Sequence, residues 1–167
     1  MKKTIFTEQT ISNIPKVIEL LTNAPDRLES LSKDLSDEQL LQPLGSGERS
    51  FTQDLAHLIN CEARSSEAIY LALLADEPLF TDIHPERQLG KLLRFDSFKF
   101  SELLAYFSLR RNVLLRVLGS LTEKDWSRSI REAGKQRKES VYWRARSIAM
   151  HELEHLSELE TKLSRLR

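Results

Sequence analysis

The sequence has little of what secreted and membrane-spanning proteins depend on. It contains one cysteine in 167 residues, which excludes an internal disulfide and therefore a disulfide-built secreted module. It also lacks any apolar run approaching the roughly 18 residues that a membrane span requires. The N-terminus starts with a basic pair but reaches Glu8 without an apolar block, so we expect no export signal. Together these features predict a cytoplasmic protein with no membrane partner.

A net charge is missing as well. The 25 Lys and Arg residues are balanced by 25 Asp and Glu residues, so no overall field favours a nucleic acid or an anionic membrane. The one basic stretch, residues 128–138, has no interleaved aromatic residues and no reading helix beside it. We therefore expect no nucleic-acid partner. A hydrophobic fraction of 40% and a charged fraction of 30% are typical of a folded globular chain.

Glycine and proline are scarce, at five residues each, and this favours long helices over a strand-and-turn architecture. Four stretches show apolar residues at three- and four-residue steps, and they cover residues 12–35, 50–75, 97–118 and 141–166. Pro25 predicts a kink or a division in the first helix. Shorter helical turns are expected after Ser36, over residues 89–95 and around Trp126, and residues 128–138 are expected to form a loop. The pattern predicts an all-α, single-domain four-helix bundle over residues 1–167.

Three of the four histidines lie where they could share one ligand. His151 and His155 are one helical turn apart, so both imidazoles project from the same surface of the last helix, a spacing that suits a metal ion. Surface or packed histidines are the alternative. His57 lies beside the apolar stripe of the second long helix, and it could complete a three-nitrogen site with open positions if these two helices are neighbours. His84 precedes Pro85, and we expect it to be exposed.

Three charged residues fall in the middle of apolar helix faces. Glu62, Arg111 and Glu152 lie on the second, third and fourth long helices, and each needs a partner because a lone buried charge is very unfavourable. The two carboxylates could orient the imidazoles or ligate the metal directly. Arg111 could hold an anionic group of a substrate, or it could form an Arg–Glu core pair without chemistry. We take these three as candidate catalytic residues.

Two further features have an ordinary packing interpretation. Cys61 lies one turn beyond His57, and we expect a small buried hydrophobe more than a thiolate ligand. The aromatic residues Trp126, Tyr142 and Trp143 are expected to pack the end of the bundle and not to form a stacking platform.

The order of these motifs resembles that of the DinB/YfiT-like superfamily over nearly the whole chain. The resemblance rests on Leu-Ser-Asp-Glu-Gln-Leu at 35–40, Ser50 opening a helix with Leu55-Ala56-His57-Leu58, Asp76-Glu77-Pro78, Arg111, Leu121-Thr122 with Asp125-Trp126, and His151-x-x-x-His155-Leu156. One departure is that Glu48-Arg49-Ser50 stands where the family often has Gly-Trp-(Ser/Thr). This departure concerns the substrate pocket more than the metal site.

The resemblance implies a four-helix bundle of up-down-down-up order, often a homodimer, with a three-histidine site for a divalent metal such as zinc or nickel. His57, His151 and His155 match those ligand positions. Characterised relatives include thiol-dependent transferases and isomerases that use bacillithiol, mycothiol or glutathione. Our leading hypothesis is therefore a metalloenzyme that presents such a thiol to a small electrophilic substrate. A metal-dependent hydrolase, a non-catalytic stress-related or scaffold bundle, and a metal-sensing or storage module stay open as alternatives.

Overall fold

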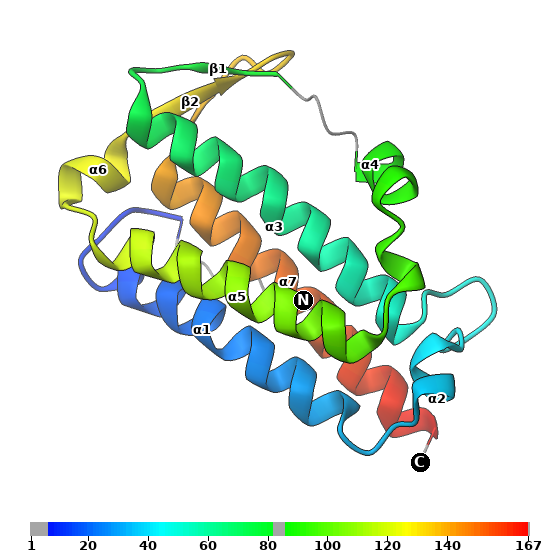
Figure 1. Cartoon of the computed structure of the whole chain (residues 1–167). Coiled ribbons are helices and arrows are strands. Elements are labelled where there is room, and N and C mark those ends of the chain that lie inside the picture. Colours follow the sequence, from blue (N-terminus) through cyan, green and yellow to red (C-terminus); the bar gives the residue numbers. More distant parts are fainter. Residues whose placement is uncertain (1–6, 82–85, 167) are drawn as a thin grey trace.

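The computed structural model describes residues 7–81 and 86–166, and its long helices form a bundle of up-down-down-up order (Figure 1). The four long helices are α1 (Asn13–Ser32), α3 (Phe51–Leu74), α5 (Phe100–Gly119) and α7 (Val141–Leu166). The shorter elements are α2 (Asp37–Leu41), α4 (Glu86–Leu93), η1 (Phe95–Ser97), α6 (Glu123–Ser127), and the strands β1 (Leu79–Phe80), β2 (Ser129–Glu132) and β3 (Lys138–Ser140). The predicted fold class is confirmed.

Local capping sets several helix starts where the sequence predicts them. Ser50 begins α3 by accepting a hydrogen bond from the Gln53 amide at 3.2 Å, while the Gln53 side chain accepts one from the Ser50 amide at 3.0 Å. Ser36 forms the same reciprocal capping box with Gln39 at the start of α2. Such a box satisfies two backbone donors that a helix start otherwise leaves without partners. These starts depend on four consecutive residues, and they are therefore readable from sequence.

The long helices are arranged so that α3 packs against both α5 and α7, and α1 packs against the same two. In Figure 1, α1 and α7 run in one direction while α3 and α5 run in the other. Because α3 and α5 are parallel, the chain between them must return along the length of the bundle, and β1, α4 and η1 lie in this connection. The predicted neighbourhood of the second and fourth long helices is confirmed.

The first helix is continuous across Pro25, so the predicted alternative of two separate helices is wrong. Proline has no amide to donate to the carbonyl oxygen four residues earlier, which here belongs to Leu21. The Arg111 guanidinium donates to that oxygen from α5, with an Nη1 to oxygen distance of 2.6 Å. A hydrogen bond from another helix thus replaces the one that Pro25 removes. The helix ends at Ser32, three residues before the predicted end.

The connection predicted as a loop over residues 128–138 contains paired strands. Strand β2 pairs antiparallel with β3 and parallel with β1, which makes a three-stranded sheet at one end of the bundle. Strands of two to four residues are too short to show a clear alternation of apolar and polar side chains. Two other boundaries also differ: α5 begins at Phe100 and not at residue 97, and α4 begins at Glu86 and not at residue 89.

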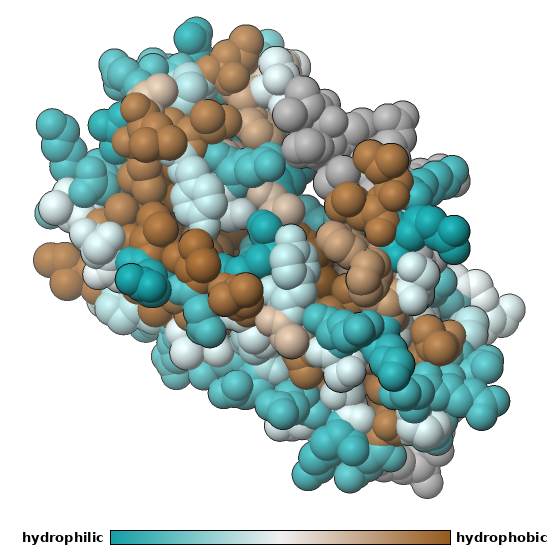
Figure 2. Space-filling model, viewed as in Figure 1, coloured by the Kyte–Doolittle hydropathy of each residue, from teal (hydrophilic) through white to brown (hydrophobic). Residues whose placement is uncertain are grey.

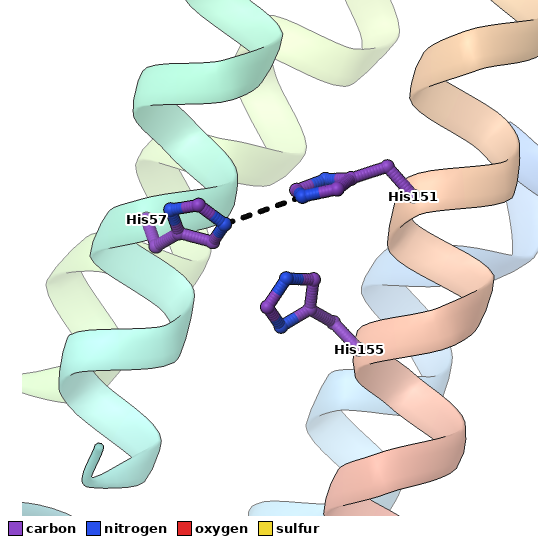
Figure 3. Close-up of side chains that lie close together, drawn as sticks. All are labelled: His57, His151 and His155. Atoms are coloured by element: carbon purple, nitrogen blue, oxygen red, sulfur yellow. Dashed lines mark hydrogen bonds between the residues drawn. The ribbon is translucent and has the colours of Figure 1, made fainter. Parts of the chain in front are cut away.

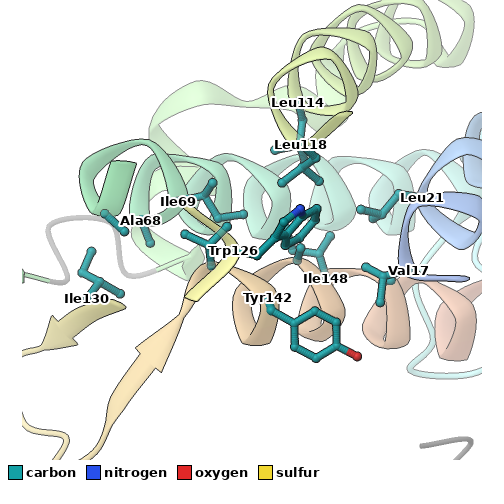
Figure 4. Packing of buried hydrophobic residues seen from close by; sticks show 14 of the residues in the cluster. Val17, Leu21, Ala68, Ile69, Leu114, Leu118, Trp126, Ile130, Tyr142 and Ile148 are labelled. Atoms are coloured by element: carbon teal, nitrogen blue, oxygen red, sulfur yellow. The ribbon is translucent and has the colours of Figure 1, made fainter. Parts of the chain in front are cut away.

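Aromatic packing closes the core at the sheet end, as expected. Trp126 and Tyr142 are 2% and 1% exposed, and their rings meet edge to face with centroids 6.3 Å apart (Figure 4). Trp143 is only partly buried, and it lies between the guanidinium groups of Arg137 and Arg146, at 4.5 and 5.1 Å from its ring centroid. The packing interpretation of Trp126 and Tyr142 is confirmed.

The surface formed by α3 and α5 carries scattered apolar side chains. Figure 2 shows apolar patches on this face, separated by hydrophilic residues. Exposed apolar residues on these two helices include Leu74, Leu109 and Val113. Among the described residues, no helix combines the length and apolarity needed to cross a bilayer.

The sheet is attached to α3 and α7 by a buried ionic network. Glu132 of β2 accepts hydrogen bonds from Arg64 of α3, at 2.7 Å, and from Arg144 of α7. Arg144 Nε also lies 2.8 Å from Oε2 of Glu139 on β3. Burial alone raises the pKa of the Glu132 carboxyl, but hydrogen bonds from Arg144 and Lys135 and the nearby positive charges outweigh it and lower the pKa to about 2.

We expect this network to make stability pH-dependent in the acid range. A carboxylate with a lowered folded-state pKa stabilises the fold above its ordinary pKa of 4.5, and this contribution is lost as the pH falls toward 2. Glu132→Gln should lower the free energy of unfolding by about 3 kcal/mol at pH 7, and the difference from wild type should shrink between pH 4.5 and 2. Urea unfolding at several pH values measures both.

Glu77→Gln is the matched control for this prediction. Its carboxylate pairs with Lys138 at the same sheet, but both side chains are about half exposed, so its removal should change stability far less than Glu132→Gln does. An effect of Glu132→Gln that stays constant down to pH 2.5 would contradict the ionic explanation.

Candidate metal centre

Three imidazoles converge in the space between α3 and α7. His57 projects from α3, and His151 and His155 project from consecutive turns of α7, so that the three rings point toward one another (Figure 3). The Nε2 atoms of His57 and His151 are 3.3 Å apart. Ring centroids are separated by 5.1 Å for His57 and His151, 4.7 Å for His57 and His155, and 4.6 Å for His151 and His155. The structure thus brings together all three predicted metal ligands.

The arrangement fits a divalent cation. One nitrogen from each ring can be chosen so that the three atoms all lie within 4.8 Å of one another. Two nitrogens bound at 2.0–2.1 Å to a tetrahedral zinc ion are about 3.3 Å apart, which matches the separation of His57 and His151. The three imidazoles are half-buried, and imidazole nitrogens are suitable ligands for both zinc and nickel. A tetrahedral or larger coordination sphere would keep at least one position open.

The surroundings of His155 favour the neutral ring that a metal ligand needs. Burial lowers the pKa of His155, and the nearby His57 lowers it further, while the negative charge of Asp54 opposes both. The Oδ1 atom of Asp54 lies 3.7 Å from Nδ1 of His155. A carboxylate on the second ring nitrogen fixes the tautomer and orientation of a ligating histidine. Asp54 therefore lies close to the second ring nitrogen of His155, although 3.7 Å is longer than a direct hydrogen bond.

Asp54 was missing from the sequence-based candidates, although one signal was present in the sequence, its place one turn before His57. It lies on α3 one turn before His57, and it is an acid that the fold buries to 4% exposure. The Nη1 atom of Arg49 lies 3.6 Å from Oδ1 of Asp54. Arg49 belongs to the segment Glu48-Arg49-Ser50 that departs from the family pattern. One residue of this segment therefore contacts Asp54, the carboxylate beside His155.

Cys61 lies at the edge of the centre. Its Sγ atom is 3.8 Å from both Nδ1 and Nε2 of His57, and its side chain is partly buried. The side chain is therefore less buried than expected of a small buried hydrophobe, because it lies beside the His57 imidazole. Among the described residues, the group whose ligand atoms meet consists of the three histidines without Cys61.

Glu62, Arg111 and Glu152 also meet, but inside the core. The Arg111 side chain is 1% exposed, and its Nη2 atom lies 2.6 Å from a carboxylate oxygen of Glu62 and 2.5 Å from one of Glu152. Burial and the neighbouring Glu62 raise the pKa of Glu152 to about 7, against the opposing effect of Arg111. These contacts favour the core-pair alternative for Arg111. The catalytic roles of the three residues stay predictions, and His84 lies outside the described residues.

Comparisons with known proteins agree with this fold. The model of the DinB superfamily matches residues 20–159. Among solved structures, the fold is similar to that of YfiT from Bacillus subtilis, described as a probable metal-dependent hydrolase with an unusual four-helix bundle topology. The TM-score is 0.86 at 18% sequence identity, and the match covers 97% of this chain and 92% of that one. No curated protein matches the sequence significantly. At this sequence identity, the likeness to YfiT shows a shared fold and no more.

Proposed function

This chain belongs to the DinB superfamily, and from that premise we propose that it is a divalent-metal-dependent enzyme acting on a small molecule. The observation that carries the proposal is the convergence of His57, His151 and His155 from two helices onto one point. When bound there, a zinc or nickel ion would supply Lewis-acid activation of a nucleophile. Three neutral ligands leave the charge of the cation uncompensated, which strengthens this activation.

The chain's own residues have separable tasks in this proposal. The imidazoles of His57, His151 and His155 would hold the cation. The Oδ1 atom of Asp54 lies 3.7 Å from Nδ1 of His155, where its negative charge would favour the proton on Nδ1 and leave Nε2 as the ligand atom. Partial burial of the three rings limits the number of competing water molecules.

The reaction class that we propose first is hydrolysis. YfiT, the similar structure, is described as a probable metal-dependent hydrolase, and a three-histidine centre suits the activation of water. Transfer of a low-molecular-weight thiol is the second candidate, and one observation favours it. The carboxylates of Glu62 and Glu152 are occupied by Arg111, so neither is placed to take a proton from water. A thiol ionises more readily than water and has less need of such a base.

Metal analysis followed by activity assays tests these proposals. We expect purified protein to contain one zinc or nickel ion per chain. Metal-loaded protein should then be assayed against panels of ester, amide and electrophilic substrates, with and without bacillithiol, mycothiol or glutathione. Turnover that is independent of added thiol supports hydrolysis, and turnover that requires thiol supports transfer. Protein that binds no divalent metal at micromolar concentration would contradict both candidates.

Asp54→Asn tests the positioning of His155 separately from the ligands. Removing the carboxylate charge should weaken zinc affinity by about 10–100-fold, because the ring loses the partner that orients it. Competition with a chromophoric chelator measures this change. Glu158→Gln is the control, since Glu158 is an exposed acid on α7 whose charge also acts on His155. Equal losses in the two variants would show a general charge effect and not a specific contact.

A further inference from the structure

The guanidinium of Arg111 connects all four long helices. It belongs to α5, and its Nε and Nη2 atoms donate to Oε2 of Glu62 on α3 at 3.0 and 2.6 Å. The same Nη2 donates to Oε1 of Glu152 on α7 at 2.5 Å. Its Nη1 donates to the Leu21 carbonyl oxygen on α1, the oxygen that Pro25 leaves without its helical donor. The Arg111 side chain therefore forms hydrogen bonds with one residue on each of the other three long helices.

This polar group divides the apolar core at the middle of the bundle. One apolar cluster includes Leu21, Ile69, Leu114 and Ala149, and the other includes Ala24, Ile59, Phe107 and Leu156. Along every long helix, the residues that meet at Arg111 fall at or near the boundary between these clusters. Apolar contacts lack direction and tolerate repacking, whereas hydrogen bonds to a planar guanidinium are restricted in distance and angle.

The two carboxylates bound by Arg111 are close in sequence to the imidazoles. Glu152 follows His151 directly, and Glu62 lies five residues after His57, about 7.5 Å along the helix axis. Because a helix is rigid over one or two turns, holding Glu62 sets the height and rotation of His57. Holding Glu152 does the same for His151 and His155.

We propose that Arg111 is a positioning residue for the metal centre, and that it sets the register of α3 against α7 in which the three imidazoles meet. The inference rests on the proposed function. Metal coordination requires side chains held within about 0.5 Å of the productive geometry, a tolerance that the apolar clusters alone do not impose. Since Arg111 is 1% exposed and bound on all sides, it acts through Glu62 and Glu152 and not on a substrate.

The first test compares Arg111→Lys with Leu118→Ala. Lysine keeps the positive charge but lacks the planar guanidinium, whose nitrogens donate to groups on three other helices. The Co²⁺ affinity should therefore fall about 10–100-fold, and the visible absorption spectrum of bound Co²⁺ should change. Leu118→Ala removes buried apolar volume from the same helix, two turns away, without touching the guanidinium. It should lower the urea midpoint while leaving Co²⁺ affinity within about twofold of wild type.

If Arg111→Lys does not fold, a triple variant tests the positioning role of Arg111. Glu62→Leu, Arg111→Met and Glu152→Leu together replace the buried charges with apolar groups, a change that proteins often accept without loss of stability. We expect a folded protein by circular dichroism with Co²⁺ affinity at least about 10-fold below wild type.

The outcomes separate the inference from the proposed function. Wild-type affinity and spectrum in the folded triple variant or in Arg111→Lys would overturn the positioning role, and so would an equal loss of affinity in Leu118→Ala. Either result would leave the metal centre itself standing. A wild-type chain that binds no Co²⁺ contradicts the proposed function first, and the inference fails with it.

Discussion

His151→Ala is expected to remove tight binding of zinc and, with it, turnover. His151 is the ligand whose Nε2 lies 3.3 Å from that of His57, and without it the remaining two imidazoles form a bidentate site. We expect the affinity to fall at least about 1,000-fold, equivalent to about 4 kcal/mol. Calorimetric titration measures the affinity directly. Thermal unfolding gives a second measure, because ligand at 100 times its dissociation constant stabilises wild type by about 2.7 kcal/mol.

Glu154→Ala is the matched control for this experiment. Glu154 is exposed on α7 between the two histidines. Its replacement therefore changes the charge of the same stretch of helix but removes none of the imidazoles. It should leave the zinc affinity within a few fold of wild type. Without metal, both variants should unfold within about 1 kcal/mol of wild type, because neither side chain is fully buried. Zinc binding that survives in His151→Ala would contradict the three-histidine centre.

Arg111→Ala is expected to destabilise the fold more than any other single change discussed so far. It leaves the carboxylates of Glu62 and Glu152 buried together without their cation, and it leaves the Leu21 carbonyl without a donor. Breaking a buried ionic group in this way lowers the free energy of unfolding by about 3–5 kcal/mol. That is a large part of the 5–15 kcal/mol typical of a domain, so the urea and thermal midpoints of unfolding should both fall markedly.

Arg110→Ala and a pH series test the cause of this loss. Arg110 precedes Arg111, and its Nε lies 3.4 Å from Oε1 of Glu62, but its side chain is 26% exposed. Its removal should lower the free energy of unfolding by less than about 1 kcal/mol. In Arg111→Ala, the deficit should be smaller at pH 5 than at pH 7, because the buried Glu152 carboxyl, whose pKa burial already raises to about 7, takes up a proton. A deficit that does not change with pH would indicate lost packing and not uncompensated charge.

Much of the candidate site was readable from sequence because its signals are periodic. His151 and His155 share a face by helical spacing alone, and the position of Glu152 within an apolar stripe predicts its burial. The same argument applied to Glu62 and Arg111, and the structure brings these three charges together. Periodicity shows which residues share a face of one helix, but it does not show which residues of another helix they contact. It therefore left Arg111 with two alternatives, and it passed over Asp54, whose importance depends on the position of His155 on another helix.

The sequence by itself determined where the helices opened by Ser36 and Ser50 begin, which faces are apolar and which residue types are available as ligands, since caps and periodic patterns act over four to a few tens of residues. Tertiary structure alone decided that α1 continues through Pro25, that residues 129–132 and 138–140 form strands anchored by Arg64 and Arg144, and that imidazoles from α3 and α7 meet. The side-chain contacts behind these outcomes join residues that lie between 12 and 94 positions apart along the chain. No local pattern encodes such partners.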